Sequence, residues 1–239
     1  MLIDAKSLGY KQINEALRNP DKENTLCGCL GQRFIAAGMT DKTITIEGVP
    51  GNALGAYLNG AKIIVSGNAQ DAVGDTMNDG RIIIHGDAGD AAGYAMRGGS
   101  IFIKGNAGYR AGIHMKAYEH KVPLMVIGGH AGSFLGEYQA GGVIVVLGLN
   151  KDEKSIVGNF PCTGMHAGKM ILRSDCKNIE FPSQVSTRAA TNEDMEEIRQ
   201  YVSEFCQLFD FDEAGVMNSP FTIVTPDSSN PYKQLYVAN

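Results

Sequence analysis

Histidine and cysteine side chains are the residues of this sequence whose chemistry could support catalysis or metal binding. His166 follows Cys162 by four positions in the stretch CTGMHAGK. A thiol activated by a neighbouring imidazole is a common nucleophile, so this pair is one candidate for covalent catalysis. A metal site is a second candidate, because imidazole and thiolate bind transition metals. Its ligands would come from a wider set: His114, His120, His130, His166, Cys27 and Cys29.

The spacing of these residues supports neither site. The histidines and the CGC stretch match no known finger or cluster spacing. His85 occupies a position that is Glu47, Ser66 and Lys104 in neighbouring repeats, which indicates one polar side chain beside a turn. The glycines of GDAGDAAG precede no Lys-Ser or Lys-Thr pair, which argues against a phosphate-binding loop. We therefore assign no catalytic residue, cofactor-binding residue or metal ligand; the remaining functional candidates are His114, Cys162 and His166.

A repeat of nineteen residues is the strongest pattern in the chain. Apolar triplets recur, and each is followed by two glycines seven positions apart, with an insertion around AYEHKVP. A short β-branched triplet closed by glycine turns is typical of a coiled parallel sheet, in which each period forms one rung. The turn glycines are Gly48, Gly67, Gly86, Gly105 and Gly129 in the first column, and Gly55, Gly74, Gly93, Gly112 and Gly136 in the second.

The repeat predicts an all-β fold, a right-handed parallel β-helix of about six coils. A left-handed hexapeptide helix needs an aliphatic residue six positions after Ile46, Val65 and Ile84, where polar residues stand instead. The calcium-binding nonapeptide pattern fails because the acidic residues do not recur at nine. We expect three regions: an N-terminal helical flank (1–24), the β-helix (25–173), and a C-terminal helix with an extended arm (174–239).

The middle residues of the triplets form a row that should face outward, because side chains alternate along a strand. Its apolar members are Ile64, Ile83, Phe102, Val126 and Val145. Such a row should not face water, so either this chain or a partner protein covers it. The chain offers a cover: a helix capped by Thr191 and ending near Phe209, with apolar residues spaced by three and four.

Composition excludes several classes of protein. The chain has 239 residues, of which 44% are hydrophobic, and a net charge of −5. This charge balance gives no basic surface for nucleic acid, and the longest apolar runs are too short to span a membrane. The start MLIDAKSLGYKQ resembles no secretory signal, and five scattered cysteines are typical of reduced thiols. We predict a cytoplasmic protein; the sequence leaves open whether it forms homo-oligomers.

Two C-terminal stretches, GEYQAGGVIVVLGLN and VGNFPCTGMHAGKMIL, together with the glycine rungs, resemble a known family. The chain is similar to the GXGXG-repeat C-terminal domain of the glutamate synthase large subunit, here free-standing, over roughly residues 25–173. A similar domain is the C subunit of formylmethanofuran dehydrogenase. The resemblance implies a structural β-helix that braces a glutaminase domain against a flavin-binding domain.

This resemblance leads to three functional hypotheses. The first is a non-catalytic subunit of a glutamate synthase-like assembly. Its partners would be a glutamine amidotransferase-like subunit and an FMN-binding subunit, and those partners would carry the FMN and any iron–sulfur cluster. The second is the corresponding subunit of a formylmethanofuran dehydrogenase-type complex. The third is a stand-alone carbohydrate-acting β-helix enzyme, which the absence of a secretory signal disfavours. It would need a row of exposed aromatic residues or a carboxylate pair along one face, and the rungs of the sequence offer neither clearly.

Overall fold

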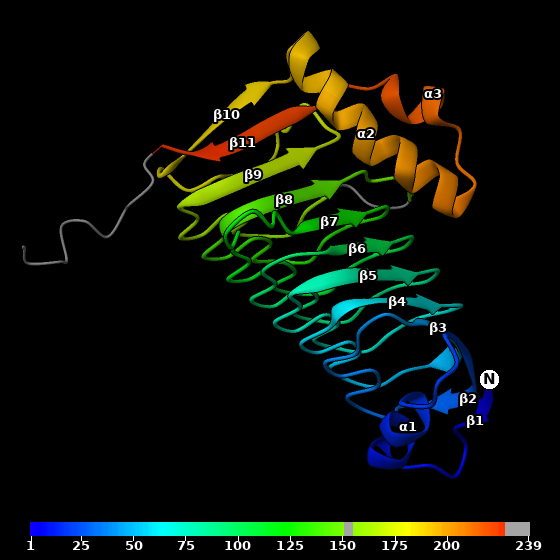
Figure 1. The fold of residues 1–239 in the computed structure, drawn as a ribbon. Coiled ribbons are helices and arrows are strands. Elements are labelled where there is room, and N and C mark those ends of the chain that lie inside the picture. The colour runs from blue at the N-terminus through cyan, green and yellow to red at the C-terminus, as the bar shows by residue number, and fades with distance from the viewer. Residues whose placement is uncertain (151–154, 228–239) are drawn as a thin grey trace, which may run out of the picture.

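The computed structural model describes residues 1–150 and 155–227, which form a parallel β-solenoid with helices at its two ends (Figure 1). Within these residues, eleven strands make one sheet in the order β1 to β9, then β11, then β10. Strands β1 to β9 pair in parallel in chain order, each with the next. The predicted fold class is therefore confirmed.

The strands of the solenoid follow the repeat. They are β1 (Leu2–Asp4), β2 (Glu23–Leu30), β3 (Thr43–Val49), β4 (Asn59–Val65), β5 (Asp79–Ile84), β6 (Ser100–Ile103), β7 (Leu124–Ile127), β8 (Ala140–Val146) and β9 (Ala167–Leu172). The helices are α1 (Tyr10–Leu17), α2 (Asn192–Phe209) and α3 (Glu213–Met217). Two further strands, β10 (Val185–Ala189) and β11 (Thr222–Pro226), pair antiparallel at the C-terminal edge of the sheet.

The number of coils differs from the prediction. The six predicted triplets lie in β3 to β8, and the register advances by one full period, as in Ile63 opposite Ile82 and Ile82 opposite Ile101. The solenoid nevertheless has about eight turns rather than six. Strands β1, β2 and β9 add rungs, and β2 pairs with β3 through a bulge between Leu26 and Cys29. Its sequence, ENTLCGCL, lacks the apolar triplet by which the other rungs were recognised.

The two glycine columns serve different purposes. The glycines of the second column have left-handed backbone conformations, as Gly74 does with φ +68°. They are also closely packed, since a Cβ on Gly74 would lie 2.6 Å from Ile101 Cδ1. The first column mainly allows close approach, since a Cβ on Gly86 would lie 2.1 Å from Asn68 Oδ1. Gly67 departs from the expectation that every turn glycine is sterically required. A Cβ there would have one neighbour, at 3.9 Å, an ordinary contact.

The chain after each of the strands β2 to β8 contains a turn with three left-handed residues at alternating positions, which we call the αL turn. Its centre is the second-column glycine in five coils, as in Arg110, Gly112 and His114 with φ of 57°, 69° and 55°, and Ala36 or Cys162 in the other two. The backbone N–H groups of this turn bond to neighbouring coils in alternation. Arg110 donates to the O of Ser133 in the following coil, and Gly112 donates to the O of Ala92 in the preceding one. These bonds between coils offset the strain of left-handed non-glycine residues.

Helix α2 covers the outward row of the sheet (Figure 1). Its N-cap is Thr191 and its last residue is Phe209, as predicted. One apolar cluster joins the row to the helix; it contains Ile83, Phe102, Val126, Val145, Ile198, Val202, Phe205 and Phe209. The sequence left open whether this chain or a partner protein covers the outward row, and in the structure helix α2 of this chain covers most of it. Ile64, farther toward the N-terminal end, is only partly buried.

The predicted flanks also join the sheet. The N-terminal helix forms as expected, and Ile13 and Leu17 of α1 belong to the solenoid core. Within the predicted extended arm, Thr222–Pro226 is strand β11, inserted between β9 and β10, so this part of the arm packs on the β-helix. Its apolar residues Ile223 and Val224 are buried there. The remainder of the arm, 228–239, lies outside the described residues. Across residues 1–150 and 155–227, no helix is long and apolar enough to cross a membrane.

Candidate functional site

The Cys162 thiol lies in the solenoid core, so it is not placed as a nucleophile. Cys162 is fully buried at the centre of an αL turn, with φ 62°, in a column that is glycine in five coils and Ala36 in another. Its Sγ lies 3.5 Å from Met170 Sδ, and burial raises the pKa of the thiol to about 12. The Nδ1 of the partly exposed His166 lies 3.2 Å from the O of Gly164. A thiol with so high a pKa stays protonated at neutral pH and is a poor nucleophile.

The histidines are dispersed over the surface of the solenoid. His85 lies edge-on to Phe209 of α2, with ring centroids 5.2 Å apart. Its pKa is lowered by burial and by the charge of Lys104. His130 Nδ1 lies 2.7 Å from the O of Ser155. Within the described part of the chain, no three His, Cys, Asp or Glu residues are arranged to hold a metal ion. The candidate ligand set of the sequence is therefore not assembled there.

His114 belongs to a row of exposed aromatic side chains carried by the αL turns. Its ring stacks on Tyr138, with centroids 5.2 Å apart and planes within 8°. The ring of Tyr94, on the other side, meets His114 edge-on at 5.9 Å. All three side chains are exposed. We call Tyr94, His114 and Tyr138 the aromatic row. His114 and Tyr138 are the third left-handed residues of successive αL turns, whereas Tyr94 immediately precedes the equivalent residue of the preceding turn, Ala95.

A second group of side chains lies on the same turns. Arg110 stacks over the ring of Phe134 at 5.2 Å, and Phe134 meets Phe160 at 5.3 Å. Arg110 also forms an ion pair with Glu137, with Nε 3.0 Å from Oε2. These contacts hold neighbouring coils together at the surface, since each joins residues from successive αL turns. Phe160 remains largely exposed, at 62%.

The insertion that interrupts the repeat is a short hairpin seated on the solenoid. Tyr118 and Lys121 pair through two backbone hydrogen bonds of 3.0 and 3.1 Å. Lys121 reaches back to Asp79, with Nζ 2.8 Å from Oδ2. Gly98 leaves room for the stem of this lysine, because a Cβ there would lie 3.0 Å from Lys121 Cβ. Beside the hairpin lies a cavity of about 240 Å³, lined by Asn59, Asn78, Arg97, Tyr118, Glu119 and Lys121.

Two ladders of Asn and Asp side chains bind successive coils together, and the sequence reasoning missed both. In the first, Asn68 Oδ1 accepts from Asp87 N at 2.9 Å, and Asp87 Oδ1 accepts from Asn106 N at 2.6 Å. In the second, Asp71 Oδ1 accepts from Asp90 N at 2.9 Å. Their signal was present, because these residues recur at the nineteen-residue period.

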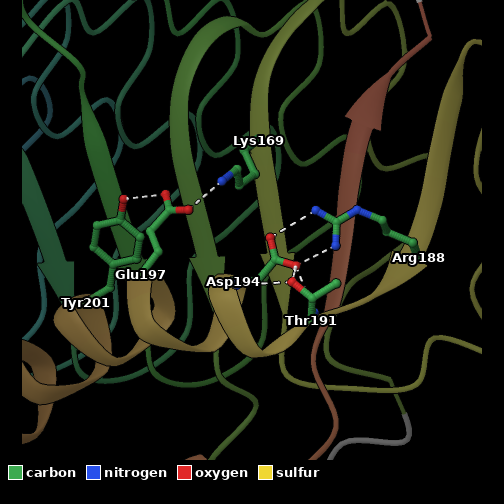
Figure 2. A network of polar contacts seen from close by, with 6 residues as sticks. All are labelled: Lys169, Arg188, Thr191, Asp194, Glu197 and Tyr201. Atoms are coloured by element: carbon green, nitrogen blue, oxygen red, sulfur yellow. Dashed lines mark hydrogen bonds and ion pairs between the residues drawn. The ribbon is translucent and has the colours of Figure 1, made fainter.

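The N-terminus of α2 is held by a polar network around Asp194 (Figure 2). The Thr191 and Asp194 side chains each accept from the other residue's backbone N–H, which is a capping box. Arg188 Nη2, on β10, donates to Asp194 Oδ1 at 2.9 Å. The Arg188 hydrogen bonds, followed by those from Thr191, lower the pKa of Asp194 well below its usual range. This network fixes the entry of the covering helix relative to the edge strand.

One turn farther along α2, a second contact joins the helix to the sheet. Lys169 Nζ, on β9, lies 2.6 Å from Glu197 Oε2, and Tyr201 Oη donates to Glu197 Oε1 at 2.9 Å (Figure 2). Burial, together with the neighbouring Glu197, raises the pKa of Tyr201. These residues join the docked helix to the sheet.

Comparisons with known proteins agree with this geometry. A family model described as GXGXG motif matches residues 10–226, most of the chain. This protein belongs to the GXGXG motif family. The matched region is wider than the predicted resemblance, because it includes α1, α2 and β11. The resemblance itself is confirmed.

Two similar proteins extend the comparison for this GXGXG protein. An uncharacterized protein of Methanocaldococcus jannaschii, MJ1350, is 45% identical over 252 residues, covering 99% of this chain and 96% of that protein. Among solved structures, the formyltransferase/hydrolase complex (FhcABCD) from Methylorubrum extorquens, in complex with methylofuran, contains a similar chain. The TM-score is 0.63 at 21% identity, over 84% of this chain and 71% of that chain. At this identity the similarity establishes the fold alone.

Proposed function

We propose that this protein is a non-catalytic, structural subunit of a multi-subunit complex of the formylmethanofuran dehydrogenase or formyltransferase/hydrolase type. The observation that carries the proposal is the fold that it shares with a chain of the FhcABCD complex. This was the second hypothesis from the sequence, and the comparisons favour it over the glutamate synthase-like assembly. No comparison supports a glutaminase or an FMN-binding partner.

The residues support a structural role. The one nucleophile candidate is buried, with a raised thiol pKa. The three-residue metal clusters that a hydrolase would use are absent from residues 1–150 and 155–227. Much of the polar chemistry holds coils together, as the Asn and Asp ladders do. A rigid rod fixes the distance between the partners bound along it, which matters when one partner passes a reactive intermediate to another. The proposal assigns the catalysis and any cofactor to the partner subunits.

Native co-purification tests the proposal. The tagged chain would be isolated from its own organism under mild conditions, and the co-purifying chains identified by mass, with flavin and metal content measured on the eluate. We expect a stoichiometric complex containing a formyltransferase-, hydrolase- or dehydrogenase-like chain. Recovery of a glutaminase-like chain with a flavoprotein would instead support the glutamate synthase-like hypothesis. A lone chain that turns over a substrate would overturn the structural role.

A further inference from the structure

We propose that the face of the solenoid around the insertion hairpin is the docking surface for an acidic segment of a partner subunit. This inference rests on the proposed function and names the chemistry of the partner. The surface consists of the aromatic row, Arg97, Lys116 and the hairpin residue Tyr118. We call it the hairpin face.

The hairpin face is continuous and exposed. His114 and Lys116 flank Met115, which is fully buried, so both project outward from the same turn. Arg97 is the equivalent of Lys116 one coil earlier, and it lines the same cavity as Tyr118. Tyr118 is 52% exposed and stands on a hairpin held at both sides. Lys121 fixes one side, and Ala117 the other, where a Cβ on Gly141 would lie 2.4 Å from Ala117 N.

The residue types are those of a protein interface. Tyrosine and arginine are enriched at the centres of interfaces, because each combines a large contact area with a polar end. The hydroxyl groups of Tyr94, Tyr118 and Tyr138 have no hydrogen-bond partner among residues 1–150 and 155–227. One face of Tyr138 is stacked on His114, and Tyr94 meets His114 edge-on. The exposed ring surfaces and hydroxyl groups that remain are available to a protein surface.

Charge identifies the partner as acidic. Although the chain has a net charge of −5, the side chains of Arg97 and Lys116 form no ion pair with any described carboxylate. The two other cations nearby are already paired, Arg110 with Glu137 and Lys121 with Asp79. The exposed carboxylate of Glu119 is the local exception. Carboxylates on a partner would complement the two free cations.

The same charges argue against a second copy of this chain. A two-fold interface brings this patch against the same patch of the second copy, which would offer the two free cations only one free carboxylate, that of Glu119. Like charges facing each other across an interface are unfavourable. The occupant that fits is therefore a different, acidic chain.

The experiment uses the full chain and the partner identified by co-purification. Hydrogen exchange would be compared between the free and bound protein, and binding measured for Arg97→Glu/Lys116→Glu against the matched control Lys11→Glu/Lys62→Glu. The control changes the charge equally at two exposed lysines away from the hairpin face. We expect protection within residues 94–121 on binding and affinity roughly 100-fold lower for the double variant, with the control unchanged. The milder Arg97→Gln/Lys116→Gln should lower affinity roughly tenfold and weaken its salt dependence.

The outcomes separate this inference from the proposed function. A wild-type complex whose protection lies elsewhere, with both double variants binding equally, would overturn the hairpin face and leave the structural role intact. A particle mass in light scattering that equals two copies of this chain, with protection of residues 94–121, would overturn the acidic partner. Failure to recover any partner would overturn the proposed function, and this inference with it.

Discussion

At the residue scale, the repeat makes equivalent positions physically different. Gly67 and Gly86 occupy the same column, yet only Gly86 faces a ladder side chain, Asn68, from the preceding coil. Gly67 follows a coil whose equivalent residue is Val49, and no side-chain atom approaches it within 4 Å. A side chain in one coil therefore decides whether the next coil tolerates a Cβ.

The first prediction compares these two glycines. Gly86→Ala should lower the free energy of unfolding by about 2 kcal/mol or more, because its Cβ would lie 2.1 Å from Asn68 Oδ1 and 2.8 Å from Asn68 N. Gly67→Ala should change it by less than about 0.5 kcal/mol. Urea unfolding followed by circular dichroism measures both. Equal effects at the two positions would contradict the role given to the ladder.

The second prediction concerns the buried thiol. Because Cys162 is fully buried and burial raises its pKa to about 12, iodoacetamide at about pH 8 should leave it unmodified in the native protein. The half-buried Cys27 should react first and serves as the internal reference. Peptide mass spectrometry before and after denaturation gives the order of labelling. Rapid native labelling of Cys162 would restore it as a functional candidate.

At the element scale, helix α2 covers the outward row of the sheet, a surface that a partner protein could otherwise have covered. Its apolar residues meet the outward row, and its N-terminus is fixed to β10 through Asp194 and Arg188. The folded-state pKa of Asp194 is lowered. A carboxylate of this kind contributes stability that is complete above its unfolded pKa of about 3.9 and is lost as the pH falls toward the lower folded value.

The third prediction follows from the lowered folded-state pKa of Asp194. Asp194→Asn should lower the free energy of unfolding by about 1–2 kcal/mol at neutral pH, because the cap and the contact with Arg188 lose the carboxylate charge. The difference between the two proteins should shrink as the pH falls below about 4. Chemical unfolding of the wild type and of Asp194→Asn from pH 7 to pH 3 measures this difference. The contributions of the other carboxylates are the same in both proteins and therefore cancel. A difference independent of pH would show that the charge of Asp194 is not what stabilises the cap.

At the scale of the whole molecule, the solenoid is covered unequally. The rungs from Ile83 to Val145 lie beneath α2, whereas Thr45 and Ile64 in the N-terminal rungs are only partly buried. Each coil contacts mainly its neighbours, so local stability in such a fold depends on local packing. The C-terminal half therefore has an additional apolar layer that the N-terminal half lacks (Figure 1).

The fourth prediction is a gradient of stability along the rod. Amide hydrogens of β6 to β8 should exchange more slowly than those of β2 to β4, because opening the covered rungs must also expose the side chains of α2. Hydrogen exchange with mass spectrometry of the intact chain measures it. The variant Phe205→Ala should reduce the contrast, since Phe205 is fully buried between the helix and the sheet. Uniform protection along the solenoid would contradict the gradient.

The sequence by itself determined the elements that repeat or that have a local signal. The triplets of β3 to β8, the left-handed glycines and α2 with its Thr191 cap all lie where the sequence predicted. These features depend on β-branching, on the freedom of glycine and on helical periodicity, which are properties of short segments. Cover of the outward row was among the predictions, because an amphipathic helix was available for it.

Tertiary structure decided the features that depend on neighbouring coils. Strand β2 forms from a sequence without the triplet because β1 and β3 supply its hydrogen-bond partners. Cys162 is buried because it lies at the centre of its αL turn, where most coils have glycine. His114 is exposed because it is the last left-handed residue of another αL turn, which directs its side chain outward. Parallel pairing joins residues far apart in the chain, so which side chains meet is settled only when the coils stack.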